Sequence, residues 1–240
     1  MAQTWYIQMT ILIHEAESRE EAALFLAEAV ANDLKQLSAS RTGPLTLLLS
    51  GGWTPAPAYK ALAKADLDWS RVSVGLVDDR WVDDKNPASN AKLVSESFLN
   101  EGASAACFVP MYKDGLSAVQ AASDIDAEYA PFSSPDIVIL GMGPDGHTAS
   151  WFPDSMGLES AMSADTKAVV AAIDATGCPV AGDLTERMTI TMPVLLNASH
   201  IFLLISGQEK RQVLEEQSKQ LPVHRLIGQL TRPMEVVWAP

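Results

Sequence analysis

Short apolar runs that end in glycine or in charged residues recur along the chain, and they are the first guide to its fold. The runs Leu45–Leu49, Val72–Val77 and Ile137–Leu140 are almost continuously apolar, which is typical of parallel strands covered on both faces. Lys167–Ile173 and Ser199–Ile205 also have strand character. Each of these segments except Lys167–Ile173 runs directly into a short polar or glycine-rich turn. These segments therefore predict the buried strands of a central sheet.

Three further segments predict strands of other kinds. Trp5–His14 is rich in β-branched and aromatic residues, and Ala106–Met111 could form a short strand. Glu186–Met192 alternates with a period of two, which places Arg187, Thr189 and Thr191 on one face of the strand.

Helical patterns fill most of the intervals between these strands. Ser18 and Glu21 form a capping box that predicts a helix to about Lys35. Four other helices are expected. One runs from after Thr54 to about Ala63, one from Asn86–Asn90 to about Leu99, one from Leu116 to Tyr129, and one from Ser206 to about Ser218. Strands that alternate with helices predict an α/β fold with three layers, α/β/α, around a mostly parallel, Rossmann-like sheet.

Composition supports one domain over residues 1–240, although two small domains are the alternative. The chain has 240 residues, of which 48% are apolar, enough for a large core. No run of about 18 apolar residues is present, and Met1–Ile13 lacks a basic region and a cleavage site, so we expect a cytoplasmic protein. Cys107 and Cys178 fit no metal-ligand spacing, so no metal is expected and both thiols are expected to be reduced.

The formal net charge of −13 restricts the partners of the chain. Nucleic acids and anionic membranes need a basic surface, so neither is expected as a partner. An anionic small molecule would also be repelled by the average field of the protein. Any anion site must therefore gather its few arginine and lysine side chains locally.

The segment Asp136–Pro153 is the first candidate for chemistry, because a buried strand leads into a glycine-rich turn with an acid and an imidazole. Asp145 and His147 lie in this turn, at the strand end where open α/β sheets place their ligands. One alternative is the dinucleotide-binding pattern, which Gly141–Gly146 spells literally. Against it, Pro153 limits the helix that should follow. The other alternative is an ordinary turn with a solvated acid and histidine.

A second candidate is the turn Ser50–Pro55, which follows another buried strand. The Ser50 and Thr54 hydroxyls, the amides of Gly51 and Gly52 and the next helix could together hold an anion without any net charge. The alternative is a plain turn with Thr54 as helix N-cap. No Walker lysine follows, so a nucleotide P-loop is not expected.

Two isolated cations have both a functional and a structural interpretation. Arg80 stands among aspartates in Asp78–Asp84, where carboxylates could orient it toward an oxyanion. The alternative is a solvated charge run. Lys210 lies in the first turn of an expected helix, where the dipole disfavours a cation, so it either reaches water or serves a bound anion.

Together these segments resemble the 6-phosphogluconolactonase family, which forms one group with the glucosamine-6-phosphate deaminases. The resemblance extends from about Leu45 to Lys210 and keeps the order of the motifs. These motifs are Ser50-Gly-Gly-x-Thr-Pro55, Asp78-Asp-Arg80 with Ser89-Asn90, Gly141-x-Gly-x-Asp-Gly-His-Thr-Ala-Ser150 with Phe152-Pro153, Arg187-x-Thr-x-Thr191, and Gly207-x-x-Lys210.

The chain departs from the family pattern at Trp53, Asp79 and Trp151, where a small polar residue, Glu and Leu are usual. Trp53 is the departure that matters, because a bulky indole beside the turn could narrow the site or only shield it.

The lactonase branch is favoured by two differences from the deaminases. The deaminase pattern continues after Gly-His to an Asn-Glu-Pro acid, whereas this chain continues to Ser150 and Pro153 without a carboxylate. The deaminases also lack an equivalent of Arg80.

The resemblance implies hydrolysis of 6-phospho-D-glucono-1,5-lactone to 6-phospho-D-gluconate without a cofactor. It implies three catalytic residues: His147 as the general base, Asp145 to orient either the imidazole or the sugar hydroxyls, and Arg80 on the developing oxyanion. The implied substrate-binding residues are Ser50, Gly51, Gly52, Thr54, Asp78, Arg187 and Lys210. The expected assembly is a monomer or a small homo-oligomer. A silent sugar-phosphate sensor and a deaminase or isomerase are the alternative functions.

Overall fold

The main sheet of the computed structural model, which describes residues 5–8 and 10–240, has eight strands in the order β1-β2-β11-β10-β7-β3-β4-β6. All neighbouring strands pair in parallel except β1 and β2, which form an antiparallel hairpin at one edge. The strands are β1 (Trp5–Gln8), β2 (Ile11–Glu15), β3 (Leu45–Leu49), β4 (Val72–Leu76), β6 (Cys107–Phe108), β7 (Ile137–Leu140), β10 (His200–Ser206) and β11 (Met234–Ala239).

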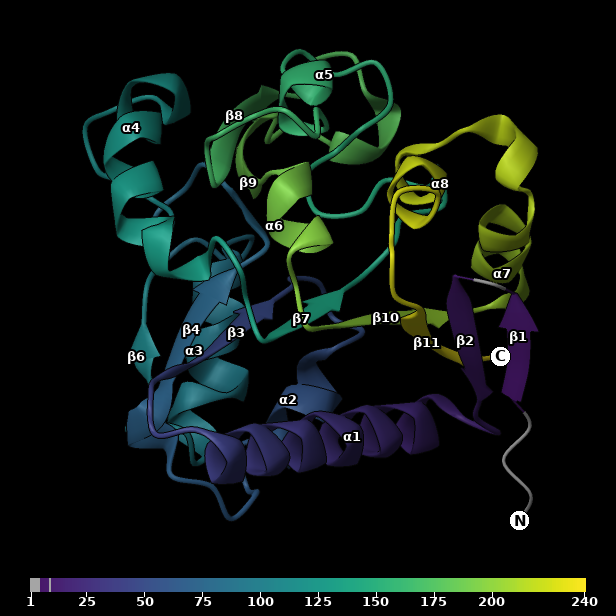
Figure 1. Ribbon diagram of the computed structural model, residues 1–240. Helices are drawn as coiled ribbons and strands as arrows, with labels where there is room; N and C mark the ends of the chain where they lie inside the picture. Colours follow the sequence, from purple (N-terminus) through teal and green to yellow (C-terminus); the bar gives the residue numbers. More distant parts are fainter. Residues whose placement is uncertain (1–4, 9) are drawn as a thin grey trace.

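Helices cover both faces of this sheet (Figure 1). On one side lie α1 (Arg19–Ser40), α2 (Ala56–Leu62) and α3 (Asn90–Ser97). On the other side lie α4 (Ala118–Tyr129), α6 (Met192–Leu196) and α8 (Pro222–Ile227). The remaining helices are α5 (Leu158–Ala161), α7 (Gln208–Glu215) and five short 3-10 turns, η1 (Trp69–Arg71), η2 (Leu99–Glu101), η3 (Ala130–Phe132), η4 (Pro179–Ala181) and η5 (Gln217–Lys219). The predicted three-layer α/β fold with a mostly parallel sheet is confirmed.

A second, three-stranded sheet was not predicted. It is antiparallel and consists of β5 (Asp78–Arg80), β9 (Glu186–Ile190) and β8 (Val170–Asp174), with β9 in the middle. The charged residues of β5 gave no strand signal, because that short segment is ordered by pairing with a distant strand rather than by its own pattern. The pairing sets Arg80 directly opposite Arg187, so this small sheet brings two cations together.

Several predicted boundaries are wrong by a few residues. The segment Trp5–His14 divides into two strands, with Met9 outside the described residues. Helix α1 continues to Ser40 rather than ending near Lys35, and Ser18 caps it as expected by accepting a hydrogen bond from the Glu21 amide at 3.1 Å. Helix α8 and strand β11 were not predicted at all.

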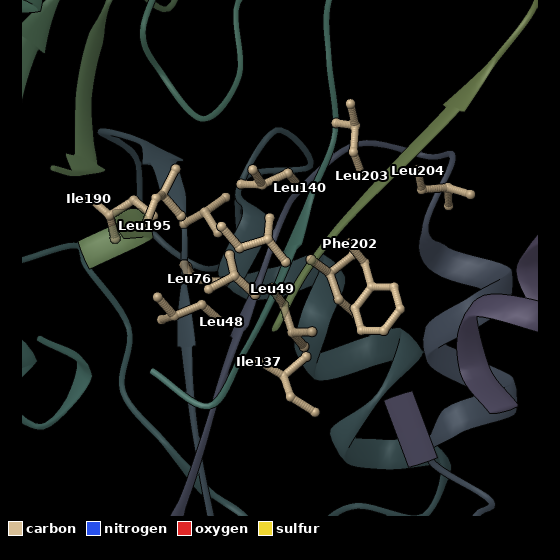
Figure 2. Close-up of a cluster of buried hydrophobic side chains, with 14 of the residues drawn as sticks. Leu48, Leu49, Leu76, Ile137, Leu140, Ile190, Leu195, Phe202, Leu203 and Leu204 are labelled. Carbon is tan, nitrogen blue, oxygen red and sulfur yellow. The ribbon is translucent and has the colours of Figure 1, made fainter. Parts of the chain in front are cut away.

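The core joins the two sheets. Figure 2 shows side chains from β3, β4, β7 and β10 packed together with Ile190 of β9 and Leu195 of α6. All ten labelled residues are buried. Because the strands are apolar on both faces, the sheet is held rigidly and its carboxyl ends are fixed in space. Among the described helices, none has the length and apolar character needed to cross a bilayer.

Candidate active site

A cavity of about 300 Å³ opens where the carboxyl ends of β3, β4, β7 and β10 meet. This is the edge at which open α/β sheets bind ligands. The predicted site residues that line the cavity are Ser50, Gly51, Gly52, Thr54, Asp78, Arg80, His147, Arg187 and Lys210. Asp145 does not line it, because it lies beside His147 and contacts the imidazole. The structure thus brings together residues that are far apart in the sequence.

The glycine-rich turn after β7 fixes the orientation of His147. Its Nδ1 lies 2.6 Å from Oδ1 of Asp145, and the same oxygen accepts a hydrogen bond from the His147 amide at 3.3 Å. Phe152 packs against the imidazole with 4.3 Å between ring centroids. A carboxylate at Nδ1 favours the tautomer that carries its proton there, which leaves Nε2 as the basic nitrogen. Among the described residues, none bonds to Nε2.

Two opposing effects act on the pKa of Asp145. Burial raises it, but hydrogen bonds from the ring and amide of His147 lower it, and the net pKa lies below the ordinary value. Asp145 is therefore ionised at neutral pH, as its contact with Nδ1 requires.

Gly143 makes the close approach of this pair possible. A Cβ atom added at position 143 would lie 2.2 Å from Cε1 of His147 and 2.7 Å from Oδ1 of Asp145. The Gly143 amide also donates to the His147 carbonyl at 2.9 Å. Any side chain at this position would displace the imidazole.

We expect Gly143→Ala to lower kcat by about tenfold or more, because a shift of about 1 Å in a catalytic group can cost as much as 100-fold. The circular dichroism spectrum and the product affinity should stay close to those of the wild type. The matched control is Gly43→Ala, whose Cβ would meet no atom within 4 Å and which, like Gly143, has no positive φ. Equal kcat in Gly143→Ala and wild type would show that the position of His147 does not limit the reaction.

The turn after β3 has the backbone of an anion cradle, but its hydroxyl is already engaged. Tyr59 donates its hydroxyl proton to the Ser50 carbonyl at 2.8 Å, and Ser50 Oγ lies 3.2 Å from the same Tyr59 oxygen. With the tyrosine proton used, Ser50 is the donor of the second bond. Thr54 lines the cavity, yet it is not the N-cap of α2, which is Pro55. The Ser50 hydroxyl is therefore already engaged, and the amides of the turn together with Thr54 remain to meet an anion.

Arg80 is oriented by neutral oxygens, which corrects the expectation that carboxylates hold it. Its NH1 donates to the Ala88 carbonyl at 3.0 Å and to Oδ1 of Asn90 at 2.8 Å. Asn90 also donates to the Asp78 carbonyl at 2.8 Å. A Cβ at Gly51 would lie 1.8 Å from the Asn90 amide oxygen, so only glycine fits next to the Asn90 side chain at this position.

Asp79 stabilises the backbone around Arg80 and Asn90. It is 1% exposed and accepts hydrogen bonds from the amides of Arg80, Asn90 and Ala91 at 2.7 to 3.0 Å. Burial raises the pKa of Asp79 to about 7, against the lowering effect of these bonds. Asp79 thus organises the start of α3 and does not enter the cavity.

Arg187 and Lys210 are cations without a carboxylate partner in the part of the chain that the structure describes. Arg187 is 4% exposed, donates to the Leu184 and Ala181 carbonyls at 2.7 and 2.9 Å, and lies 5.3 Å from the Phe152 ring centroid. Burial lowers the pKa of both Arg187 and Lys210. Within the described residues, neither cation, nor Arg80, forms an ion pair. Partly desolvated cations of this kind are suited to an anionic ligand.

The dinucleotide alternative for Gly141–Gly146 has no structural support. The residues after Gly146 form turns, and the next helix is the four-residue α5, which begins at Leu158. The helix N-terminus that should hold a pyrophosphate is therefore not beside this turn.

Trp53 does not fill the cavity. Its side chain is 84% exposed, and it lines two neighbouring surface hollows instead. Trp53 therefore leaves the cavity open.

The family model of glucosamine-6-phosphate isomerases/6-phosphogluconolactonase matches residues 17–238. The chain belongs to this family.

Individual members of the family are similar over most of their length. A 6-phosphogluconolactonase from Rhizobium meliloti is 38% identical over 224 residues, which are 90% of this chain and 94% of the relative. One from Xylella fastidiosa is 42% identical over 192 residues, 79% of each chain. The crystal structure of a 6-phosphogluconolactonase from Shewanella baltica superposes with a TM-score of 0.89 at 31% identity and covers 98% of this chain and 99% of that one. The prediction of an enzyme of the lactonase class is confirmed.

Within this family framework, two residues that contact the site were not predicted as site residues. Asn90 holds Arg80, and Phe152 contacts both His147 and Arg187. Both belong to the motifs that carry the family resemblance, Ser89-Asn90 and Phe152-Pro153. That membership was the signal that could have identified them.

Ser150, which stands where the deaminase pattern approaches its acid, donates to Oδ2 of Asp78 at 2.6 Å. It supplies a hydroxyl rather than a carboxylate.

Proposed function

We propose that this chain hydrolyses 6-phospho-D-glucono-1,5-lactone to 6-phospho-D-gluconate, the second step of the oxidative pentose phosphate pathway. The observation that carries the proposal is one cavity lined by a carboxylate-oriented histidine and by three cations that form no ion pair among the described residues. The reaction as written needs only water and the side chains of the cavity, and no cofactor. The lactonase names of the relatives support the same substrate.

The phosphate of the substrate is bound by Arg187, Lys210 and the amides of the Ser50–Thr54 turn. The chain is acidic, with a formal net charge of −13. Because the two cations lie on the same cavity, they make the local electrostatic potential favourable for an anion there. Both cations have a lowered pKa because they are buried, and a bound dianion would restore the stability of their charged forms. Binding at this remote end fixes the lactone ring for reaction.

Hydrolysis begins when Nε2 of His147 takes a proton from a water molecule as the water oxygen attacks the lactone carbonyl carbon. The imidazolium that forms is stabilised by Asp145 at Nδ1. The carbonyl oxygen becomes an oxyanion, and the guanidinium of Arg80 donates to it. When the intermediate collapses, the ring C–O bond breaks and the imidazolium returns its proton to the leaving ring oxygen. Asp78 lies at the cavity wall, where its carboxylate can accept a hydrogen bond from a sugar hydroxyl, and the buried Ser150 donates to its Oδ2 from behind.

A spectrophotometric assay tests this proposal directly. The lactone is supplied, formation of 6-phosphogluconate is coupled to its oxidation, and the rate without protein is subtracted, because the lactone also hydrolyses spontaneously. We expect a protein-dependent rate that saturates with lactone. A rate equal to the background, with product still bound, would instead identify a catalytically silent sugar-phosphate sensor.

A further inference from the structure

A second cluster of chemically active side chains lies at the other end of the sheet from the cavity. Asp33 comes from α1, His200 from the first residue of β10, and Glu235 from near the start of β11. The cavity, by contrast, lies at the carboxyl ends of the strands. Because the three residues are far apart in the sequence, no short-range ligand motif could have predicted this cluster.

The register of the sheet explains why the side chains meet. Phe202 pairs with Glu235 across β10 and β11, and His200 precedes Phe202 by two residues. Residues two apart in a strand face the same side, so His200 and Glu235 project from one face of the sheet.

Helix α1 covers that face (Figure 1). Its buried stripe includes Val30 and Leu34, and Asp33 lies between them, three residues after Val30. Three rigid elements therefore converge on this point.

The distances within the cluster match those of a metal site. One ligand atom from each of the three residues lies within 4.8 Å of the others. His200 Nδ1 and Asp33 Oδ2 are 3.3 Å apart, longer than a strong charge-assisted hydrogen bond of about 2.7–2.9 Å. Zinc bonds to nitrogen and oxygen are about 2.0–2.2 Å long, which in a tetrahedron separates neighbouring ligands by roughly 3.3–3.5 Å. A separation of 3.3 Å therefore fits two ligands of one ion, and it also lies within the range of an ion pair.

The electrostatic environment also lacks a compensating cation. Among the described residues, neither Asp33 nor Glu235 forms an ion pair with a lysine or an arginine. The exposed Arg232 donates to the Ser199 carbonyl instead, at 3.4 Å. Two half-buried carboxylates thus lie close together, with His200 as the ion-pair partner of Asp33 in the described part of the chain.

We propose that Asp33, His200 and Glu235 bind one divalent transition-metal ion, for which zinc is the best match. One imidazole and two carboxylates suit zinc, whereas magnesium and calcium favour ligand sets made only of oxygen. Water completes the coordination. The ion links α1 to β10 and β11 at the end of the sheet away from the cavity, so its role is to stabilise the fold.

Calorimetric titration of the metal-free protein with zinc tests the proposal. We expect one site, and we expect Asp33→Asn, His200→Gln and Glu235→Gln each to weaken it at least tenfold, since even loss of an outer-shell partner costs about 10–100-fold. Glu28→Gln is the matched control, because it removes one negative charge from the exposed side of the same helix. His147→Asn is a second control that excludes zinc binding in the cavity, and both controls should bind zinc as the wild type does.

Two further readouts do not depend on how well the variants fold. Zinc should raise the melting temperature of the wild type, whereas magnesium at the same concentration should not. Cobalt in place of zinc should give the wild type the intense visible absorption of a four-coordinate site. Absence of zinc binding by the wild type, or wild-type affinity in all three ligand variants, would overturn the proposal.

Discussion

We expect His147→Ala to lower kcat by about 10²–10⁴, the usual effect of losing a general base. The large effect is expected because no other imidazole lines the cavity among the described residues. The affinity for 6-phosphogluconate should change little, because its phosphate is bound by Arg187 and Lys210. The measurement is steady-state hydrolysis after subtraction of the spontaneous rate, together with calorimetry of product binding.

Two companion experiments separate the role of the base from a general disturbance of the site. Imidazole added to His147→Ala should restore part of the lost rate, because it can occupy the space of the missing ring. Asp145→Ala should lower kcat less than His147→Ala, and the double variant should be no slower than His147→Ala, since the two residues act as a unit. A near-normal kcat in His147→Ala would mean that another group is the base.

Arg187→Ala and Lys210→Ala should each weaken binding of 6-phosphogluconate by on the order of 2–5 kcal/mol, as expected when one partner of a desolvated charge pair is removed. Their effects on stability should differ. Arg187 donates to the carbonyls of Ala181 and Leu184, so its loss should also lower the free energy of unfolding by about 1–3 kcal/mol. The Lys210 side chain forms no hydrogen bond among the described residues, so its loss should affect binding alone.

The matched control for these variants is Lys35→Ala, which removes one positive charge from the exposed surface of α1. Calorimetric titration gives the affinities, and urea denaturation gives the stabilities. If both cavity variants bound product as tightly as Lys35→Ala, the phosphate would have to lie elsewhere.

The parallel sheet could be predicted because each of its strands has a clear local sequence pattern. Leu45–Leu49 and Ile137–Leu140 are observed with the predicted bounds, since a strand buried on both faces must be continuously apolar. The turns that follow such strands necessarily meet at one edge of the sheet. For that reason the sequence already grouped Ser50, Arg80, His147 and Lys210, and the structure places all four on one cavity.

Contacts between distant segments could not be predicted in the same way. The three-stranded sheet depends on the pairing of β5 with β9, and nothing within Asp78–Arg80 specifies that partner. The wrong expectation for Arg80 has the same origin. Aspartates next to it in sequence suggested ion pairs, whereas the Arg80 guanidinium forms none among the described residues and donates to Asn90 from α3 instead.

The position of β11 in the sheet has a consequence for how the chain folds during its synthesis. This strand lies between β2 and β10, and it pairs Val236 with Ile13 from the opposite end of the chain. An emerging nascent chain therefore keeps two apolar strand edges open until residues 234–239 have left the ribosome. Non-local parallel pairing of this kind is slow, and open edges favour aggregation. Truncation before β11 should therefore yield insoluble protein rather than a weakened enzyme, and chaperone demand in the cell should end only when this last strand inserts.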